Sequence, residues 1–134
     1  MGDIRIGKVS SVDFKNGMVK VAYYDKGEAV TGMFPYASFN GEYFMPSIGE
    51  SVLVAHLSNG SSHGVVISTF WNQVNNPPMP GEHIYRKEFS HKTGESYMSY
   101  NAESNELVIK SPNIVFEDAS GRITVKELLT MLCN

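Results

Sequence analysis

The pattern of hydrophobic and polar positions predicts strands over the first 71 residues of the chain. Ile4–Phe14 is rich in isoleucine and valine, and Met18–Tyr24 places Val19, Val21 and Tyr23 on one face. Alternation with a period of two is typical of a strand that buries one face. Further runs of this kind, each apolar enough for a strand, lie at 30–34, 51–57 and 63–71.

Short turn motifs separate these runs. Asn16-Gly17, Asp25-Lys26-Gly27 and Asn59-Gly60 contain residues that tolerate positive φ, and such motifs join antiparallel strands. The longer connection 35–50 combines proline and glycine, which argue against a helix, with aromatic residues. We expect it to be ordered and packed on the barrel or on a neighbour. Five strands with a long connection between the third and the fourth predict a five-stranded OB-fold barrel. The periodicity alone does not distinguish it from an SH3-like barrel.

The composition changes at residues 72–81, which contain three prolines and three asparagines. Each proline restricts its own backbone and that of the residue before it, so this segment is expected to be a stiff, extended linker. We therefore predict a barrel domain over 1–71, this linker, a second strand-rich domain over 82–125 and a short helix over 126–134.

The second domain repeats short strands at close spacing, with expected positions near 82–89, 95–100, 106–110, 113–117 and 122–125. A single sheet with one apolar face needs a partner layer, and no helix is predicted to cover it. Self-association supplies that layer, and a threefold β-prism also removes exposed edges. The candidates for the core of such a trimer are Met98, Tyr100, Leu107, Ile109, Ile114, Phe116, Ile123 and Val125.

The C-terminal residues predict a short amphipathic helix. Thr124 and Glu127 fit a capping box, with Thr124 as the N-cap residue. So short a helix is unstable in isolation, so its apolar side is expected to dock either on its own trimer or on a partner protein. The docking candidates are Leu128, Leu129, Met131 and Leu132.

Composition and charge argue against several classes of function. The chain has 134 residues, 11 basic and 14 acidic side chains, and a formal net charge of −3. It lacks the basic stripe of a nucleic-acid binder and any apolar run near the roughly 18 residues that a membrane span needs. No signal peptide is expected from the first residues, and the single cysteine, Cys133, excludes an intrachain disulfide.

Residue patterns that carry chemistry are sparse. His56, His63, His83 and His91 are too far apart to form a typical metal site, and we read them as solvated or hydrogen-bonded. The sequence has neither a nucleophile elbow nor a phosphate-binding glycine loop. We therefore expect no enzymatic activity, no metal and no cofactor. An alternative function is an OB-fold module that binds single-stranded nucleic acid or an oligosaccharide by stacking on aromatic side chains.

Several segments resemble the baseplate assembly protein V family, which includes the central spikes of contractile phage tails, bacteriocins and VgrG-type injection systems. The segments similar to its OB domain are Phe44–His56, Gly64–Ile67, Phe70-Trp71-Asn72 and Asn76-Pro77-Pro78. The start of the chain, Ile4–Val9, resembles the first strand of that domain. The segments similar to the β-prism that follows it are Ser111–Ile114 and Gly121–Ile123.

The resemblance implies a homotrimeric structural spike that attaches to a tail hub or tube-initiator protein and helps to pierce the target envelope on contraction. A PAAR-like tip protein is a further candidate partner, contact with the target membrane is transient, and no nucleic acid is involved. The implied location is the baseplate of a virion or tail-like particle assembled in the bacterial cytoplasm. The chain lacks the His-x-His iron motif that spikes of this family often carry at the tip, so no tip metal is expected.

Overall fold

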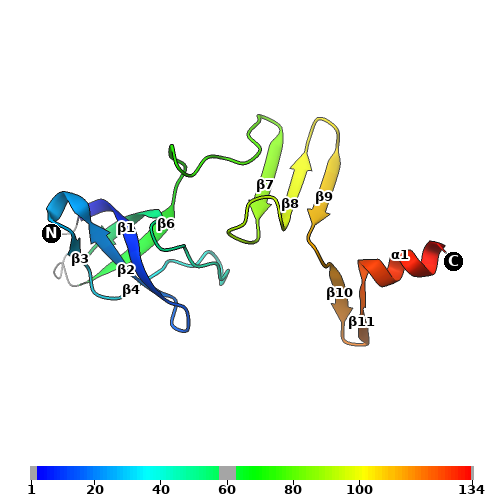
Figure 1. Ribbon diagram of the computed structural model, residues 1–134, viewed down its shortest axis with the longest axis horizontal. Helices are drawn as coiled ribbons and strands as arrows, with labels where there is room; N and C mark the ends of the chain where they lie inside the picture. Colours follow the sequence, from blue (N-terminus) through cyan, green and yellow to red (C-terminus); the bar gives the residue numbers. More distant parts are fainter. Residues whose placement is uncertain (1–2, 58–62, 134) are drawn as a thin grey trace. The chain divides into compact units, whose positions relative to one another are not determined.

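The computed structural model describes residues 3–57 and 63–133. The chain is mostly β, with one short C-terminal helix (Figure 1). It divides into two compact units, Met1–Asn76 and Pro77–Asn134. The division lies inside the segment 72–81, which the sequence predicts to be a linker.

The first unit is one antiparallel sheet. Its strands are β1 (Asp3–Asp13), β2 (Met18–Tyr23), β3 (Ala29–Val30), β4 (Phe34–Pro35), β5 (Ser51–His56) and β6 (Gly64–Thr69). They pair in the order β3-β2-β1-β5-β6, and β4 also pairs with β2. An isolated parallel bridge between Tyr36 and Val66 brings the segment after β4 beside β6. Among the described residues no continuous ladder joins β6 to β3 or β4, so a closed barrel is not seen.

The predicted strand at 30–34 is two short strands, β3 and β4, which makes the sheet six-stranded. Thr31 explains the interruption. Its backbone N–H donates to the Val21 carbonyl at 2.8 Å, but the Val21 N–H donates to the Thr31 hydroxyl at 3.0 Å. A side chain therefore takes the place of a backbone acceptor, and the ladder stops there. The predicted Asn59-Gly60 turn lies outside the described residues.

The core of the first unit consists of valines from its strands, the rings of Tyr23 and Phe34, and Met45 from the connection before β5. The largest fully buried side chains are those of Val19, Val21, Phe34, Val52, Val54 and Val66. On β5 buried and half-buried positions alternate along the whole strand, as the period of two predicts. Burial of such a side chain contributes roughly 1.5–3 kcal/mol to folding. The first unit therefore has a hydrophobic core of its own.

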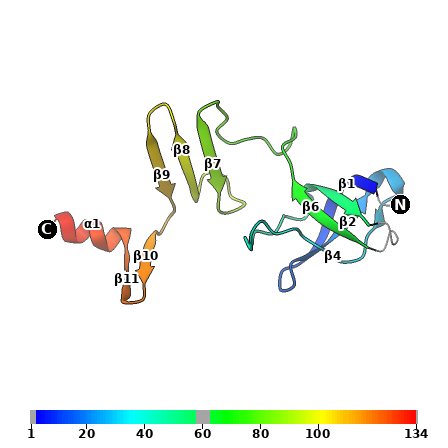
Figure 2. The ribbon, with the colours of Figure 1, turned by 180° about the vertical axis from the view of Figure 1, so that it is seen from behind.

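The second unit contains two small sheets and the helix. Strands β7 (Ile84–Glu88), β8 (Tyr97–Asn101) and β9 (Glu106–Lys110) form an antiparallel three-stranded sheet, β10 (Val115–Asp118) pairs with β11 (Gly121–Thr124), and α1 spans Val125–Cys133. Figure 2 shows the same elements from behind. The helix begins with the predicted capping box: the Thr124 N–H donates to Glu127 Oε1, and the Glu127 N–H donates to Thr124 Oγ1, each at 3.0 Å.

Candidate interaction surfaces

One face of the β7-β8-β9 sheet is apolar and exposed. Tyr85 pairs with Tyr100, Tyr100 with Leu107, and Met98 with Ile109. Residues that pair directly across antiparallel strands point to the same side of the sheet. These five side chains therefore lie on one side of the sheet, together with Lys87, which pairs with Met98; we call the five the apolar sheet face. Leu107 is 60% exposed and Ile109 is 53% exposed, so no part of the chain that the structure describes covers the third strand of this face.

The sequence pattern places four of these residues on a common face but misses Tyr85 and its neighbour Phe89. The Phe89 N–H donates to the Ser96 carbonyl at 2.8 Å, which extends the β7–β8 register by one pair and puts Phe89 on the same face. Tyr85, Lys87 and Phe89 alternate along the strand and so share one side, and Lys87 pairs with Met98. This alternation could have identified Tyr85 and Phe89 only if the register of β7 against β8 had been known.

The opposite face of this sheet carries Ile84 and Val108 beside charged side chains that are paired within the chain. Arg86 Nε donates to Glu88 Oε2 at 2.5 Å, and the Arg86 guanidinium lies 3.7 Å from the centre of the Tyr97 ring. The other Glu88 oxygen accepts a hydrogen bond from the Gly94 N–H at 2.8 Å. The hydrogen bond from Arg86, followed by the one from Gly94, holds the pKa of the Glu88 carboxyl below its ordinary value. This arrangement ties the β7–β8 loop to the sheet.

The β10–β11 hairpin has a second apolar face. Phe116 pairs with Ile123, and one step further the Val125 N–H donates to the Ile114 carbonyl at 2.8 Å. These four residues lie on one side of the hairpin, which we call the apolar hairpin face. On the other side Glu117 and Arg122 form an ion pair at 3.3 Å. Phe116 is 55% exposed.

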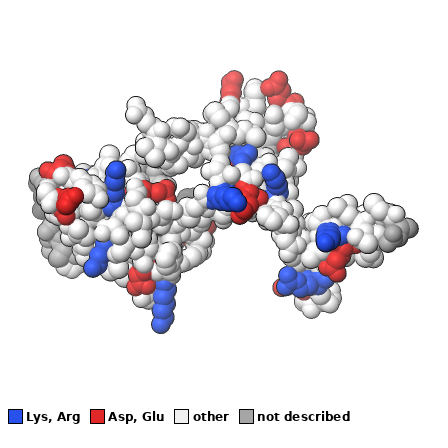
Figure 3. Space-filling model, viewed as in Figure 1, with Lys and Arg blue, Asp and Glu red and all other residues white. Residues whose placement is uncertain are grey.

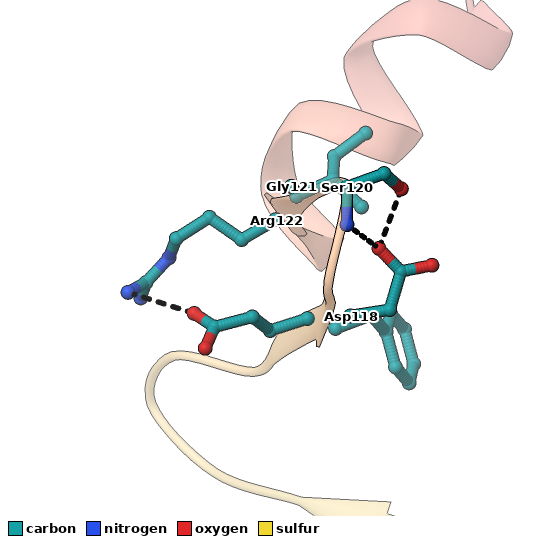
Figure 4. A pocket seen from close by; sticks show the side chains of 7 residues that line it. Asp118, Ser120, Gly121 and Arg122 are labelled. Atoms are coloured by element: carbon teal, nitrogen blue, oxygen red, sulfur yellow. Dashed lines mark hydrogen bonds and ion pairs between the residues drawn. The ribbon is translucent and has the colours of Figure 1, made fainter.

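A shallow depression at the tip of this hairpin is the pocket drawn in Figure 4. The Asp118 carboxylate accepts hydrogen bonds from the Ser120 N–H at 2.8 Å and from the Ser120 hydroxyl at 2.7 Å. Both bonds are made within the turn, and they lower the pKa of Asp118 below its ordinary value. The polar groups of the depression therefore stabilise the turn and do not converge on a ligand.

The helix α1 contributes a third apolar surface. None of its described residues is buried. Of the predicted docking residues, Leu129, Met131 and Leu132 are 56%, 67% and 75% exposed, and Leu128 is half-buried. The structure thus presents the side chains that the sequence predicts for docking, without a contact that covers them.

Burial differs sharply between the two units. Every buried apolar side chain among the described residues belongs to the first unit. In residues 77–133 the single buried side chain is that of Ser99, which is 8% exposed. The second unit thus has secondary structure and internal hydrogen bonds but no hydrophobic core, while its apolar residues lie on exposed faces.

The first unit holds a buried polar cluster. His56 is 8% exposed, its Nε2 is hydrogen-bonded to the Tyr23 hydroxyl at 2.6 Å, and the Phe34 ring meets it edge-on. The Arg5 guanidinium lies 4.0 Å from the centre of the Tyr23 ring and 3.6 Å from the Asp25 carboxylate. Burial raises the pKa of Tyr23. This histidine is a core residue, and the part of the chain that the structure describes has no group of side chains that could hold a metal.

The connection between β4 and β5 is packed on its own sheet at some residues and exposed at others. Met45 and Pro46 are buried, and Tyr36 is half-buried. Phe39 is 80% exposed, and Tyr43 is 63% exposed while its hydroxyl donates to the Phe14 carbonyl at 2.8 Å. The exposed aromatic side chains of this connection are therefore available for a contact with another chain.

Charged side chains do not form a single-sign surface in the view of Figure 3, where basic and acidic residues are interspersed. A groove that tracks a nucleic-acid backbone needs a run of basic side chains. No described helix has the length and apolar character needed to cross a bilayer. The exposed surfaces with a clear chemical character are consequently the apolar ones.

A comparison with protein families gives a match over the first unit. The profile of the type VI secretion system/phage-baseplate injector OB domain matches residues 5–71, which is half of the chain and includes β2 to β6 and all but the first two residues of β1. A comparison with curated proteins finds no match.

Proposed function

Because the chain belongs to the family of type VI secretion system and phage-baseplate injector OB domains, we propose that it is the central spike of a contractile injection machine. Members of this family are structural baseplate proteins that associate with other tail or baseplate components. The chain accordingly has a structural role in a phage-like tail. The proposal adds the oligomeric state, the place within the baseplate and the mechanical action.

The proposed assembly is a homotrimer in which three first units form an OB-fold collar and three second units form a β-prism. One observation carries this proposal: residues 77–133 of the second unit bury no apolar side chain but display the apolar sheet face and the apolar hairpin face. A sheet with one apolar face gains its stability by packing against another layer. Threefold association gives each sheet two identical neighbours.

The Arg86 side of the β7-β8-β9 sheet indicates how the sheet is oriented in the proposed trimer. Arg86 and Glu88 satisfy each other, with side chains only 10% and 19% exposed, and Tyr97 covers the guanidinium. Such a face needs no protein partner and is suited to contact water. The apolar sheet face would then point to the threefold axis, and the Arg86 side of the sheet would point outward.

In this assembly the collar attaches to the tail hub, and the prism points toward the target envelope. Contraction of the sheath supplies the energy for penetration, while this chain supplies a stiff shape and carries out no catalysis. The exposed aromatic residues of the β4–β5 connection, of which Phe39 is the most exposed, are candidates for contacts of the collar with the hub or with a neighbouring copy.

Light scattering of the purified chain tests the trimer. The expected mass is three times the 14.8 kDa of one chain, and the assembly should resist heat and SDS. Detection of only monomers at micromolar concentration would sink the proposal.

A pair of double variants tests which face forms the contact. Leu107→Gln with Ile109→Gln alters the apolar sheet face, and Glu106→Gln with Lys110→Gln alters the other face of the same strand. Both leave the net charge unchanged and place two glutamines on β9. Since a buried leucine or isoleucine contributes roughly 1.5–3 kcal/mol, the first variant should dissociate and the second should stay trimeric. Equal masses for the two variants would contradict the assigned face.

A further inference from the structure

The apolar hairpin face continues into the C-terminal helix through Val125. Its N–H donates to the Ile114 carbonyl at 2.8 Å, one step beyond the last β10–β11 pair, Val115 with Thr124. At that step its side chain lies on the same side of the hairpin as Ile123. Val125 is also the first residue of α1, so no linker separates the strand from the helix.

An apolar seam runs along α1 from this residue. Leu128, Leu129 and Leu132 follow Val125 by three, four and seven positions, and residues at these spacings share one side of a helix. We call these four residues the helix seam. The remaining apolar residue, Met131, lies six positions after Val125 and off the seam. The seam carries no charge, because Lys126 and Glu127 fall on other sides of the helix.

The helix has little support within its own chain. It has 9 residues, whereas isolated helices shorter than about 12–15 residues are marginal in water. Leu129 is 56% exposed and Leu132 is 75% exposed, and no described residue of α1 is buried. The capping box fixes where the helix begins but leaves the seam in solvent. An ordered α1 therefore requires a surface that covers Leu129 and Leu132.

We infer that three copies of α1 cover one another as a parallel three-helix bundle at the end of the prism. This inference rests on the proposed trimer. The seam is continuous with the apolar hairpin face, so a hairpin that packs against the threefold axis directs the seam to the same axis. In Figures 1 and 2 α1 leaves the end of β11 at a steep angle to that strand. The helix can thus run along the axis while the strands cross it.

Threefold symmetry makes the α1 helices of neighbouring copies the surfaces that cover the seam. Around a threefold axis the same residue of each copy lies at the same height, so Leu132 meets Leu132 and Leu129 meets its equivalents. Apolar residues that are three and four positions apart are typical of the contact positions in helical bundles. The bundle locks the three chains together at the point where the sheet pairing ends.

A disulfide test on the purified full chain shows whether α1 of another copy covers the seam. In a Cys133→Ser background, Leu132→Cys places the single thiol on the seam, and Thr130→Cys places it on the other side of the same helix. Mild oxidation should link two of the three copies in each Leu132→Cys trimer and few in the Thr130→Cys control. Equal, low linkage in both variants, with the trimer intact by light scattering, would overturn the bundle but leave the proposed trimer standing.

Hydrogen exchange measures whether the seam is buried. In the purified trimer the amides of α1 should be protected, and Leu129→Gln with Leu132→Gln should make them exchange at least about tenfold faster while the mass remains that of a trimer. The matched control, Lys126→Gln with Thr130→Gln, should leave protection unchanged. Unprotected α1 amides in the native trimer would refute the bundle and assign the seam to another protein. A monomeric native chain would refute both the bundle and the proposed function.

Discussion

At the scale of single residues, the first unit depends on a close approach of β6 to the core. A Cβ atom on Gly64 would lie 2.7 Å from Phe34 Cε2 and 2.8 Å from the Ala55 carbonyl oxygen. Phe34 is 2% exposed and the carbonyl is part of a strand, so neither can easily move. Glycine is therefore required at this position for steric reasons.

We expect Gly64→Ala to destabilise the first unit by about 1–3 kcal/mol, the usual cost of overpacking a core. Gly32→Ala is the matched control, because a Cβ there would meet nothing within 4 Å. Denaturant unfolding followed by near-ultraviolet circular dichroism measures both. The same midpoint for the two variants would show that the core can accommodate the added methyl group.

Glu88 should make the second unit sensitive to acid. The hydrogen bond from Arg86 lowers the pKa of Glu88 in the folded chain, so its stabilising effect is present above the unfolded pKa, about 4.3 for glutamate. That effect is lost as the pH falls through the lower, folded pKa. Glu88→Gln should lower the melting temperature at neutral pH and flatten its decline below about pH 4.3.

Thermal unfolding between neutral and acidic pH measures this effect. Glu106→Gln is the control, since it removes an exposed carboxylate from the end of β9. If the native chain and Glu88→Gln lose stability in parallel on acidification, the ion pair with Arg86 does not contribute.

Single residues also show which features of the fold the sequence predicts and which it does not. The alternation of Leu107 with Ile109 and of Ile114 with Phe116 is local, and the structure places each pair on one face as expected. The burial of His56 is not local, since it depends on Tyr23 and Phe34 from other strands. The sequence indicates only a solvated or hydrogen-bonded histidine at that position.

At the scale of elements, α1 is defined by its first turn. The side chains of Thr124 and Glu127 each accept the other residue's N–H. The bond from the Thr124 N–H to the Glu127 carboxylate is the largest cause that holds the pKa of Glu127 below its ordinary value. Thr124→Ala removes one acceptor, and the loss of such a cap costs about 1 kcal/mol. We expect faster amide exchange in the first turn of α1.

The control for the cap is Thr130→Ala, which changes the same residue type near the other end of α1. Alanine favours helix, so exchange in α1 should stay equal or become slower. If both alanine variants speed exchange equally, the capping box is not what determines the start of the helix.

Elements differ in how well the sequence predicts them. The strands from β7 to β11 have short, regular spacing, and their predicted bounds lie within a few residues of the observed ones. The strand expected at 30–34 is divided because the Thr31 hydroxyl replaces a backbone acceptor, and no periodicity reveals such a bond. Closure of the barrel likewise depends on pairing between distant strands, and the observed ladder remains open among the described residues.

At the scale of the whole molecule, the two units differ in the origin of their stability. The first unit has a core, whereas the second unit, in the proposed assembly, obtains one from neighbouring copies. Binding that occurs only in the folded state makes a melting temperature depend on concentration. We expect calorimetry to show a transition of the first unit that is independent of concentration and a transition of the second that rises with it.

Gly64→Ala serves to assign the two transitions, because it acts on the first unit alone and should shift only the concentration-independent transition. A tenfold range of protein concentration suffices for the measurement. If the melting temperatures of both transitions are independent of protein concentration, the second unit is stable without neighbouring copies.

At this scale the sequence marks one boundary between two parts of the chain. The proline-rich stretch 72–81 contains the observed division at Asn76 and Pro77 because proline limits the backbone whatever surrounds it. The need of the second unit for a partner also follows from the sequence, since too few residues are present for two layers. Which surfaces remain exposed requires the strand register, as the case of Tyr85 shows.

The missing core of the second unit also affects biosynthesis. Residues up to 76 leave the ribosome first and contain every described buried apolar side chain, so they can fold on the nascent chain. In the proposed assembly, the apolar faces of residues 77–133 stay accessible to proteases and chaperones until two further chains bind. Because three chains must meet, the yield of the proposed trimer should rise more steeply than in proportion to the expression level.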